Sequence, residues 1–240
     1  MTRLALFDLD GTLTDTNAVD GECYLEAMSS ELGCALNPDW TTYRHCTDAG
    51  IAHESLSNFF GRPPSPQEID RLRGRFVALL EARLAEDPSR FSAMPGAAAL
   101  LSRLQEEGWH LCIATGGWST SAELKRRAAG LPDTVSIFSS DLHHTREGIL
   151  EIAIRRMREG NGVPSYDPII SLGDGVWDVT AAAALRLPFV GVGRGARADR
   201  LREAGARAVL SDFANLADAL ETIASAGPPV RGPRIAGKEP

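Results

Sequence analysis

The chain has 240 residues, of which 43% are hydrophobic and 24% charged, and its formal net charge at pH 7 is −7. A chain of this length can form one large domain, or a core domain with an insertion, without a disulfide or metal as a staple. The acidic balance argues against nucleic acid or an anionic membrane as the main partner. No CxxC pair, signal-peptide pattern or apolar run of about 18 residues is present, so we predict a cytoplasmic protein with free thiols.

The first structural signal is the apolar run Leu4-Ala5-Leu6-Phe7, which predicts a buried strand over residues 3–7. It is followed by Asp8-Leu9-Asp10-Gly11-Thr12. Because side chains alternate along an extended chain, Asp8 and Asp10 would point the same way. Two such carboxylates suit a bound cation, or a nucleophile beside an acid/base. The simpler alternative is an Asp-Gly turn after a strand.

Residues 16–90 have helical patterning and no convincing strand. We expect helices near 16–32 and 50–60, and a third that begins after the Pro-rich loop and ends near residue 86. This stretch therefore predicts a helical insert directly after the first strand.

From residue 96 onward, predicted strands and helices alternate. The expected strands are 110–114, 134–138, 168–172, 189–192 and 208–210, and the expected helices are 96–107, 147–159, 176–186 and one from about 119. Alternation of this kind predicts an α/β core, a parallel sheet with helices on both faces. The expected division is a core of residues 1–15 and 91–225, the insert 16–90, and a disordered tail 226–240.

The predicted strands end in chemically active residues. The second ends in Thr115-Gly116-Gly117, Arg146 follows the third, and the fourth ends in a segment with Asp174 and Asp178. Open α/β sheets bind ligands at this edge. Carboxylates there would bind Mg²⁺, the Thr115 hydroxyl with the two glycine amides would hold a phosphate, and Arg146 would neutralise it.

In this order, the motifs resemble those of the haloacid dehalogenase-like superfamily, specifically its capped phosphatase branch of phosphoglycolate phosphatase and beta-phosphoglucomutase type. The resemblance covers residues 3 to 224. It implies a Rossmann-like parallel sheet core with a helical cap domain inserted after the first strand, at the place where the helical insert is predicted.

The resemblance also implies roles for the motif residues. Asp8 would be the nucleophile, and Asp10 would protonate the leaving oxygen and then activate water. Thr115 and Gly116 would bind the phosphoryl group. The Mg²⁺ site would comprise Asp8, Asp10 through its backbone carbonyl, Asp174 and, in support, Asp178. Because haloacid dehalogenases themselves lack the second aspartate, Asp10 points to phosphoester chemistry.

One feature departs from the family pattern, which places a lysine after the third strand. The only lysines are Lys125 and Lys238, and neither lies there. We therefore expect Arg146 to replace that lysine, with a planar fork instead of a point charge. Lys125, on the helix after Thr115, is interpreted as a surface charge.

A polar stretch of the insert, residues 43–50, lies between two predicted helices. In capped relatives a loop of this kind closes over the active site and contacts the leaving group. Arg44, His45 and Asp48 are the candidates for substrate selection, with an ordinary solvated loop as the alternative.

The resulting hypothesis is a Mg²⁺-dependent phosphatase that acts on a small phosphorylated metabolite through an aspartyl-phosphate. The first alternative is a phosphomutase on the same site, and the second is a non-catalytic, receiver-like binding protein. The expected partner is the small-molecule substrate, with no nucleic acid and no membrane, and the expected assembly is a monomer or homodimer.

Overall fold

The computed structural model describes residues 2–230 and contains, within that range, a six-stranded parallel sheet in the order β3-β2-β1-β4-β5-β6. The strands are β1 (Arg3–Phe7), β2 (Trp109–Ala114), β3 (Ser136–Phe138), β4 (Ile169–Gly173), β5 (Phe189–Val192) and β6 (Val209–Leu210). Strand order reverses around β1, which pairs with β2 on one side and β4 on the other. The predicted α/β, Rossmann-like fold is therefore confirmed.

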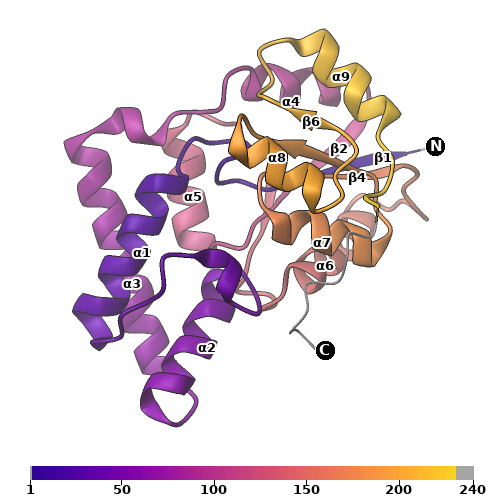
Figure 1. Ribbon diagram of the computed structural model, residues 1–240. Coiled ribbons are helices and arrows are strands. Elements are labelled where there is room, and N and C mark those ends of the chain that lie inside the picture. The colour runs from indigo at the N-terminus through magenta and orange to yellow at the C-terminus, as the bar shows by residue number, and fades with distance from the viewer. Residues whose placement is uncertain (1, 231–240) are drawn as a thin grey trace.

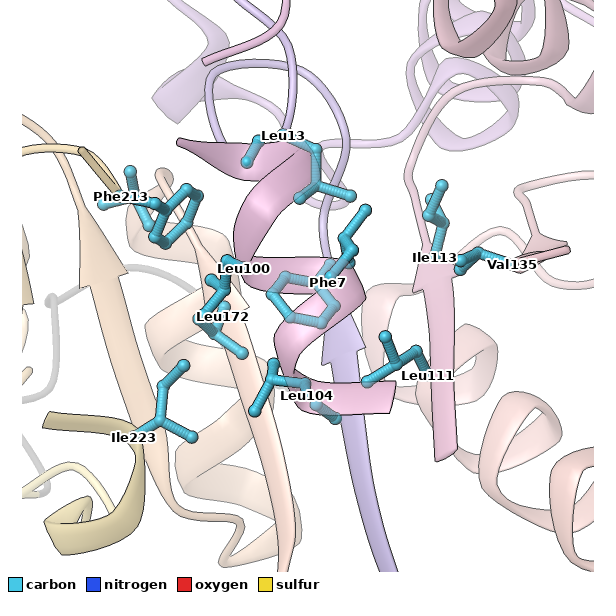
Figure 2. Packing of buried hydrophobic residues seen from close by; sticks show 14 of the residues in the cluster. Phe7, Leu13, Leu100, Leu104, Leu111, Ile113, Val135, Leu172, Phe213 and Ile223 are labelled. Atoms are coloured by element: carbon cyan, nitrogen blue, oxygen red, sulfur yellow. The ribbon is translucent and has the colours of Figure 1, made fainter. Parts of the chain in front are cut away.

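Helices cover both faces of this sheet. Their bounds are α4 (Ala97–Glu106), α5 (Ser119–Ala128), α6 (Arg146–Gly160), α7 (Val176–Leu185), α8 (Ala196–Glu203) and α9 (Leu216–Ser225). Alternation along β1 divides the core: Ala5 and Phe7 pack with α4 and α9, whereas Leu4 and Leu6 pack with α6 and α7. Figure 2 shows the first face, where Phe7 lies beside Leu100 and Leu104 of α4.

The chain between β1 and α4 is helical. It forms α1 (Asn17–Leu32), α2 (Asp48–Phe60) and α3 (Pro66–Glu86), with short 3₁₀ turns at Trp40–Thr42 and Pro88–Phe91. These three helices lie to one side of the sheet (Figure 1). They share a separate buried apolar cluster, which Trp118 and Leu124 join from the core side. This grouping supports a cap at residues 16–90, a division that stays a prediction.

Local sequence explains where the cap helices begin and end. Ser65 and Glu68 form a capping box at the start of α3, with Pro66 in its first turn. Gly33 ends α1 in the left-handed conformation, with φ of 67°. None of the helices within residues 2–230 is both long and apolar enough to cross a membrane.

The expected tail needs a correction at its start. The sequence predicts disorder from residue 226, but the chain stays bound to the core as far as Val230. The Phe189 amide donates to the Gly227 carbonyl at 3.2 Å, and the Val230 amide donates to the Gly205 carbonyl at 2.9 Å. Backbone pairing thus offsets a composition rich in Pro and Gly. The rest of the predicted tail, residues 231–240, lies outside the described residues.

Candidate active site

A pocket of about 720 Å³ lies at the carboxyl edge of the sheet, between the core and the cap helices. Residues from the ends of β1, β2 and β4 line its floor, and α1, α2 and the 3₁₀ turn at Trp40–Thr42 contribute its opposite wall. Asp8, Asp10, Thr115, Gly116, Arg146 and Asp174 all line it. The topology therefore brings Asp8 and Asp174 to one pocket, although they are 166 positions apart in the chain.

Asp8 lies at the centre, with only 5% of its surface exposed. Arg146 Nη1 donates to Asp8 Oδ1 at 2.7 Å and lies 3.1 Å from Asp178 Oδ1. Burial raises the pKa of Asp8, an effect that Arg146 opposes. Arg146 is the first residue of α6 and not, as expected, part of the preceding loop. Its Thr145 N-cap orients that first turn.

Asp8, Asp174 and Asp178 form a buried carboxylate cluster, with one oxygen of each lying within 4.8 Å of the others. Burial, followed by the charge of Asp8, raises the pKa of Asp174 to about 7. Burial also raises the pKa of Asp178 to about 8, although Arg146 opposes it. Carboxylates that repel one another in a desolvated site are stabilised by a cation, and three oxygens fit Mg²⁺. This donor set therefore fits the predicted metal.

Two further side chains contact the Asp174 carboxylate. Its Oδ2 accepts from Asn17 Nδ2 at 2.7 Å and lies 2.8 Å from Arg197 Nη1. Gly11 has a φ of 75°, and a Cβ there would overlap the Asn17 amide and the Asp174 carboxylate. A positive φ and the lack of space for a Cβ both require glycine at position 11, so Gly11 leaves room for the Asp174 carboxylate.

The Asp10 side chain belongs to a different group. Lys125 Nζ donates to Asp10 Oδ2 at 2.6 Å, and Thr16 Oγ1 donates to Oδ1 at 2.5 Å. Lys125 also donates to Asp20 Oδ1 at 2.5 Å. Among the described residues, the carboxylate cluster of Asp8, Asp174 and Asp178 does not include the Asp10 side chain. Coordination of a metal by the backbone carbonyl of Asp10 stays a prediction.

Lys125 was predicted to be a surface charge, and this is wrong. Its side chain is completely buried. Burial by itself would lower its pKa, but Asp10 and Asp20 raise it overall, so the ammonium stays charged. A sequence signal did exist, because position 125 lies three residues after Ala122 and next to Leu124, on the buried face of α5. Which carboxylates meet that face depends on how the cap packs.

The loop after β2 contributes Thr115, Gly116 and Gly117 to the lining of the pocket. Thr115 is 1% exposed, and its hydroxyl accepts the Gly117 amide at 3.1 Å. The Gly117 N–H is therefore engaged within the loop, contrary to the expectation that both glycine amides are exposed. A Cβ on Gly116 would lie 2.7 Å from Arg146 Nη2. This glycine thus admits the guanidinium to the pocket.

The three cap candidates separate. Asp48 lines the pocket, and its Oδ2 accepts the Trp118 amide at 2.9 Å while its own amide donates to the Gly116 carbonyl. Arg44 and His45 do not line the pocket. Arg44 is exposed, and the His45 ring packs edge-on against His144 at 5.3 Å between centroids. Of the three candidates, only Asp48 lies at the pocket. The first half of the loop turns away from it, and the Arg44 amide donates to Glu54.

Comparisons with known proteins find one matching family and a similar phosphatase. The model of the haloacid dehalogenase-like hydrolase family matches residues 2–186. A phosphoglycolate phosphatase from Rhodospirillum rubrum is 26% identical over 220 residues, covering 91% of this chain and 90% of that protein.

Two solved structures extend the likeness to the fold. A hydrolase from Pseudomonas syringae is 28% identical with a TM-score of 0.71, covering 94% of this chain and all of that chain. CbbY from Rhodobacter sphaeroides, solved in complex with phosphate, is 24% identical with a TM-score of 0.64 and matches this chain in fold, covering 90% of it and 96% of that chain. The chain therefore belongs to the haloacid dehalogenase-like hydrolases and is an enzyme of their phosphatase branch.

Proposed function

We propose that the chain is a Mg²⁺-dependent phosphatase that hydrolyses a small phosphorylated metabolite through an aspartyl-phosphate on Asp8. The observation that carries this proposal is the buried contact of Asp8 with Arg146, within the cluster that includes Asp174 and Asp178. A carboxylate held beside a guanidinium is positioned to attack a phosphoryl group that the same guanidinium attracts.

In the proposed first step, an Asp8 oxygen attacks phosphorus and the bond to the leaving oxygen breaks, while Asp10 donates a proton to that oxygen. In the second, Asp10 takes a proton from water, which attacks phosphorus and releases phosphate from Asp8. Arg146 balances the phosphoryl charge in both steps, and the Thr115 hydroxyl and the Gly116 amide bind its oxygens. Asp8, Asp174 and the carbonyl of Asp10 would hold Mg²⁺, with Asp178 in support. Bound there, the ion would neutralise phosphate charge.

The walls of the pocket suggest the class of substrate. The cap side supplies carboxylates, a hydroxyl and aromatic rings, including Asp48, Tyr24 and Trp40. The cationic lining of the pocket, Arg146, Arg197 and Arg200, comes from the core. A volume of about 720 Å³ with a lid of helices suits a small metabolite whose phosphate faces the core and whose hydroxyl groups face the cap.

The direct test is phosphate release from a panel of sugar phosphates, nucleotides, phosphoglycolate and an aryl phosphate, with and without Mg²⁺. We expect metal-dependent release that is lost in Asp8→Asn, a nearly isosteric change that removes the nucleophile. Asp133→Asn, at an aspartate outside the pocket, serves as a matched control. Release that survives in Asp8→Asn refutes the mechanism. Turnover that requires a bisphosphate primer favours the phosphomutase instead.

A further inference from the structure

Lys125 is an ammonium group with no access to solvent. Burying such a charge is costly unless it is paired and hydrogen-bonded, and here two carboxylates pair with it. Its Nζ lies 2.6 Å from Asp10 Oδ2 in the core and 2.5 Å from Asp20 Oδ1 on α1 of the cap. The lysine therefore connects the acid/base of the proposed reaction with the cap.

The same lysine completes a clamp on the Asp10 carboxylate. Lys125 occupies Oδ2, and Thr16 Oγ1 occupies Oδ1 at 2.5 Å. Thr16 is itself fully buried, and its hydroxyl lies 2.6 Å from that of Thr14. The terminal torsion of an aspartate is broad when nothing restrains it. Two donors on opposite oxygens fix that torsion and so fix the face that Asp10 presents to the pocket.

The position of Asp10 matters because proton transfer requires hydrogen-bond geometry. Asp10 keeps 15% of its side chain exposed, and it lines the pocket beside Asp8. Asp20, on the far side of the ammonium, holds Lys125 against the first turns of α1. The order Asp20–Lys125–Asp10 thus runs from the cap, through a buried cation, to the group that serves the leaving oxygen.

We propose that Lys125 is a positioning residue that, together with Thr16, holds Asp10 in the orientation needed for proton transfer to the leaving oxygen. This inference rests on the proposed phosphatase function. Lys125 touches neither the phosphoryl group nor the nucleophile in this role. The competing explanation is purely structural, with Lys125 only joining helix α5 to helix α1.

Leaving groups of different acidity separate the two explanations. The phenolate of 4-nitrophenyl phosphate departs with little help from an acid, whereas that of phenyl phosphate needs more. A defect in Asp10 therefore lowers kcat/KM more for phenyl phosphate than for 4-nitrophenyl phosphate. A general loss of structure lowers both alike.

The key variant is Lys125→Met combined with Asp20→Asn, which removes one charge of each sign and leaves no unpaired Asp20 carboxylate. Arg127→Met is the matched control, since Arg127 lies on the same helix with 70% of its side chain exposed. Each variant is assayed with saturating Mg²⁺ on both esters. The Asp10→Asn variant is assayed alone and in combination with the Lys125 and Asp20 changes.

We expect the Lys125→Met/Asp20→Asn protein to lose at least tenfold more kcat/KM on phenyl phosphate than on 4-nitrophenyl phosphate, with KM within about threefold of the wild type. In the Asp10→Asn background the same changes should have less than a twofold effect. Equal losses on both esters, or a loss that persists without Asp10, would overturn the inference. A wild-type protein that releases phosphate with Mg²⁺ from neither ester nor any other substrate of the panel overturns the proposed function and this inference with it.

A second variant covers the case in which the double change prevents folding. Thr16→Val keeps the shape of the side chain and removes the donor to Asp10 Oδ1. It should reproduce the preferential loss on phenyl phosphate, at about fivefold or more, because it releases the other side of the same clamp. Equal activity of Thr16→Val on both esters, relative to wild type, counts against the clamp.

Discussion

Gly116→Ala is predicted to damage the enzyme by pushing on Arg146. The backbone of Gly116 is not in the left-handed region, so alanine is allowed there. Its Cβ, however, would lie 2.7 Å from Arg146 Nη2 and 2.8 Å from Cζ. Non-bonded heavy atoms reach their best separation at about 3.5 Å, so the guanidinium must withdraw by about 0.8 Å.

A shift of that size is enough to stretch the 2.7 Å contact between Arg146 and Asp8 beyond hydrogen-bond length. A hydrogen bond to a charged group contributes about 1.5–3 kcal/mol. If that energy is lost in the transition state, kcat/KM falls about 10- to 150-fold. Because the same hydrogen bond is present in the folded protein without substrate, the free energy of unfolding should fall by a similar amount, about 1.5–3 kcal/mol.

The assay is the initial rate of phosphate release, with the thermal unfolding midpoint measured on the same samples. Gly117→Ala is the matched control, because its Cβ would make only ordinary contacts, 3.5 Å from Thr115 Oγ1 and 3.6 Å from Ser121 Oγ. Its activity should stay within about threefold of the wild type. If Gly116→Ala is as active as the control, the contact between Arg146 and Asp8 does not contribute to catalysis as we reason.

Two further predictions concern the metal site. Arg197 lies 2.8 Å from Asp174 in a partly exposed position and would compete with Mg²⁺ for that carboxylate. Arg197→Gln should therefore lower the Mg²⁺ concentration for half-maximal activity by about two- to tenfold, whereas Arg200→Gln on the same helix should not change it. An increased Mg²⁺ requirement in Arg197→Gln contradicts this prediction. The second prediction concerns pH. Burial raises the pKa of Asp174 to about 7 and of Asp178 to about 8, above unfolded values of about 3.9. The folded metal-free protein therefore binds more protons than the unfolded protein and becomes less stable as pH rises from 5 to 8. In EDTA the thermal unfolding midpoint should fall over this range, more steeply in the wild type than in Asp178→Asn, and the increase in the midpoint on adding Mg²⁺ should become larger. Equal slopes in the two proteins refute the raised pKa of Asp178.

The sequence determined the fold class and the gathering of the motif residues, because both depend on local signals. The strand that precedes Asp8 and the strand that precedes Asp174 are each recognisable from a short apolar run. In a parallel sheet their carboxyl ends necessarily meet at one edge. The sequence put Arg146 in the loop before the helix, and the structure makes it the first residue of α6. It reaches the pocket all the same, because a helix boundary that moves by one residue hardly changes where the side chain starts.

Only the tertiary structure decided how the charges are paired. Lys125 is one of two lysines in the chain and was interpreted from the sequence as a surface charge, whereas the structure places it on the buried side of α5. Its partners Asp10 and Asp20 come from the first loop and from the cap, more than 100 residues away. Such long-range contacts decide whether a buried lysine destabilises the fold or holds a neighbouring carboxylate in place. A charge is stable in the interior only where packing supplies its counterions.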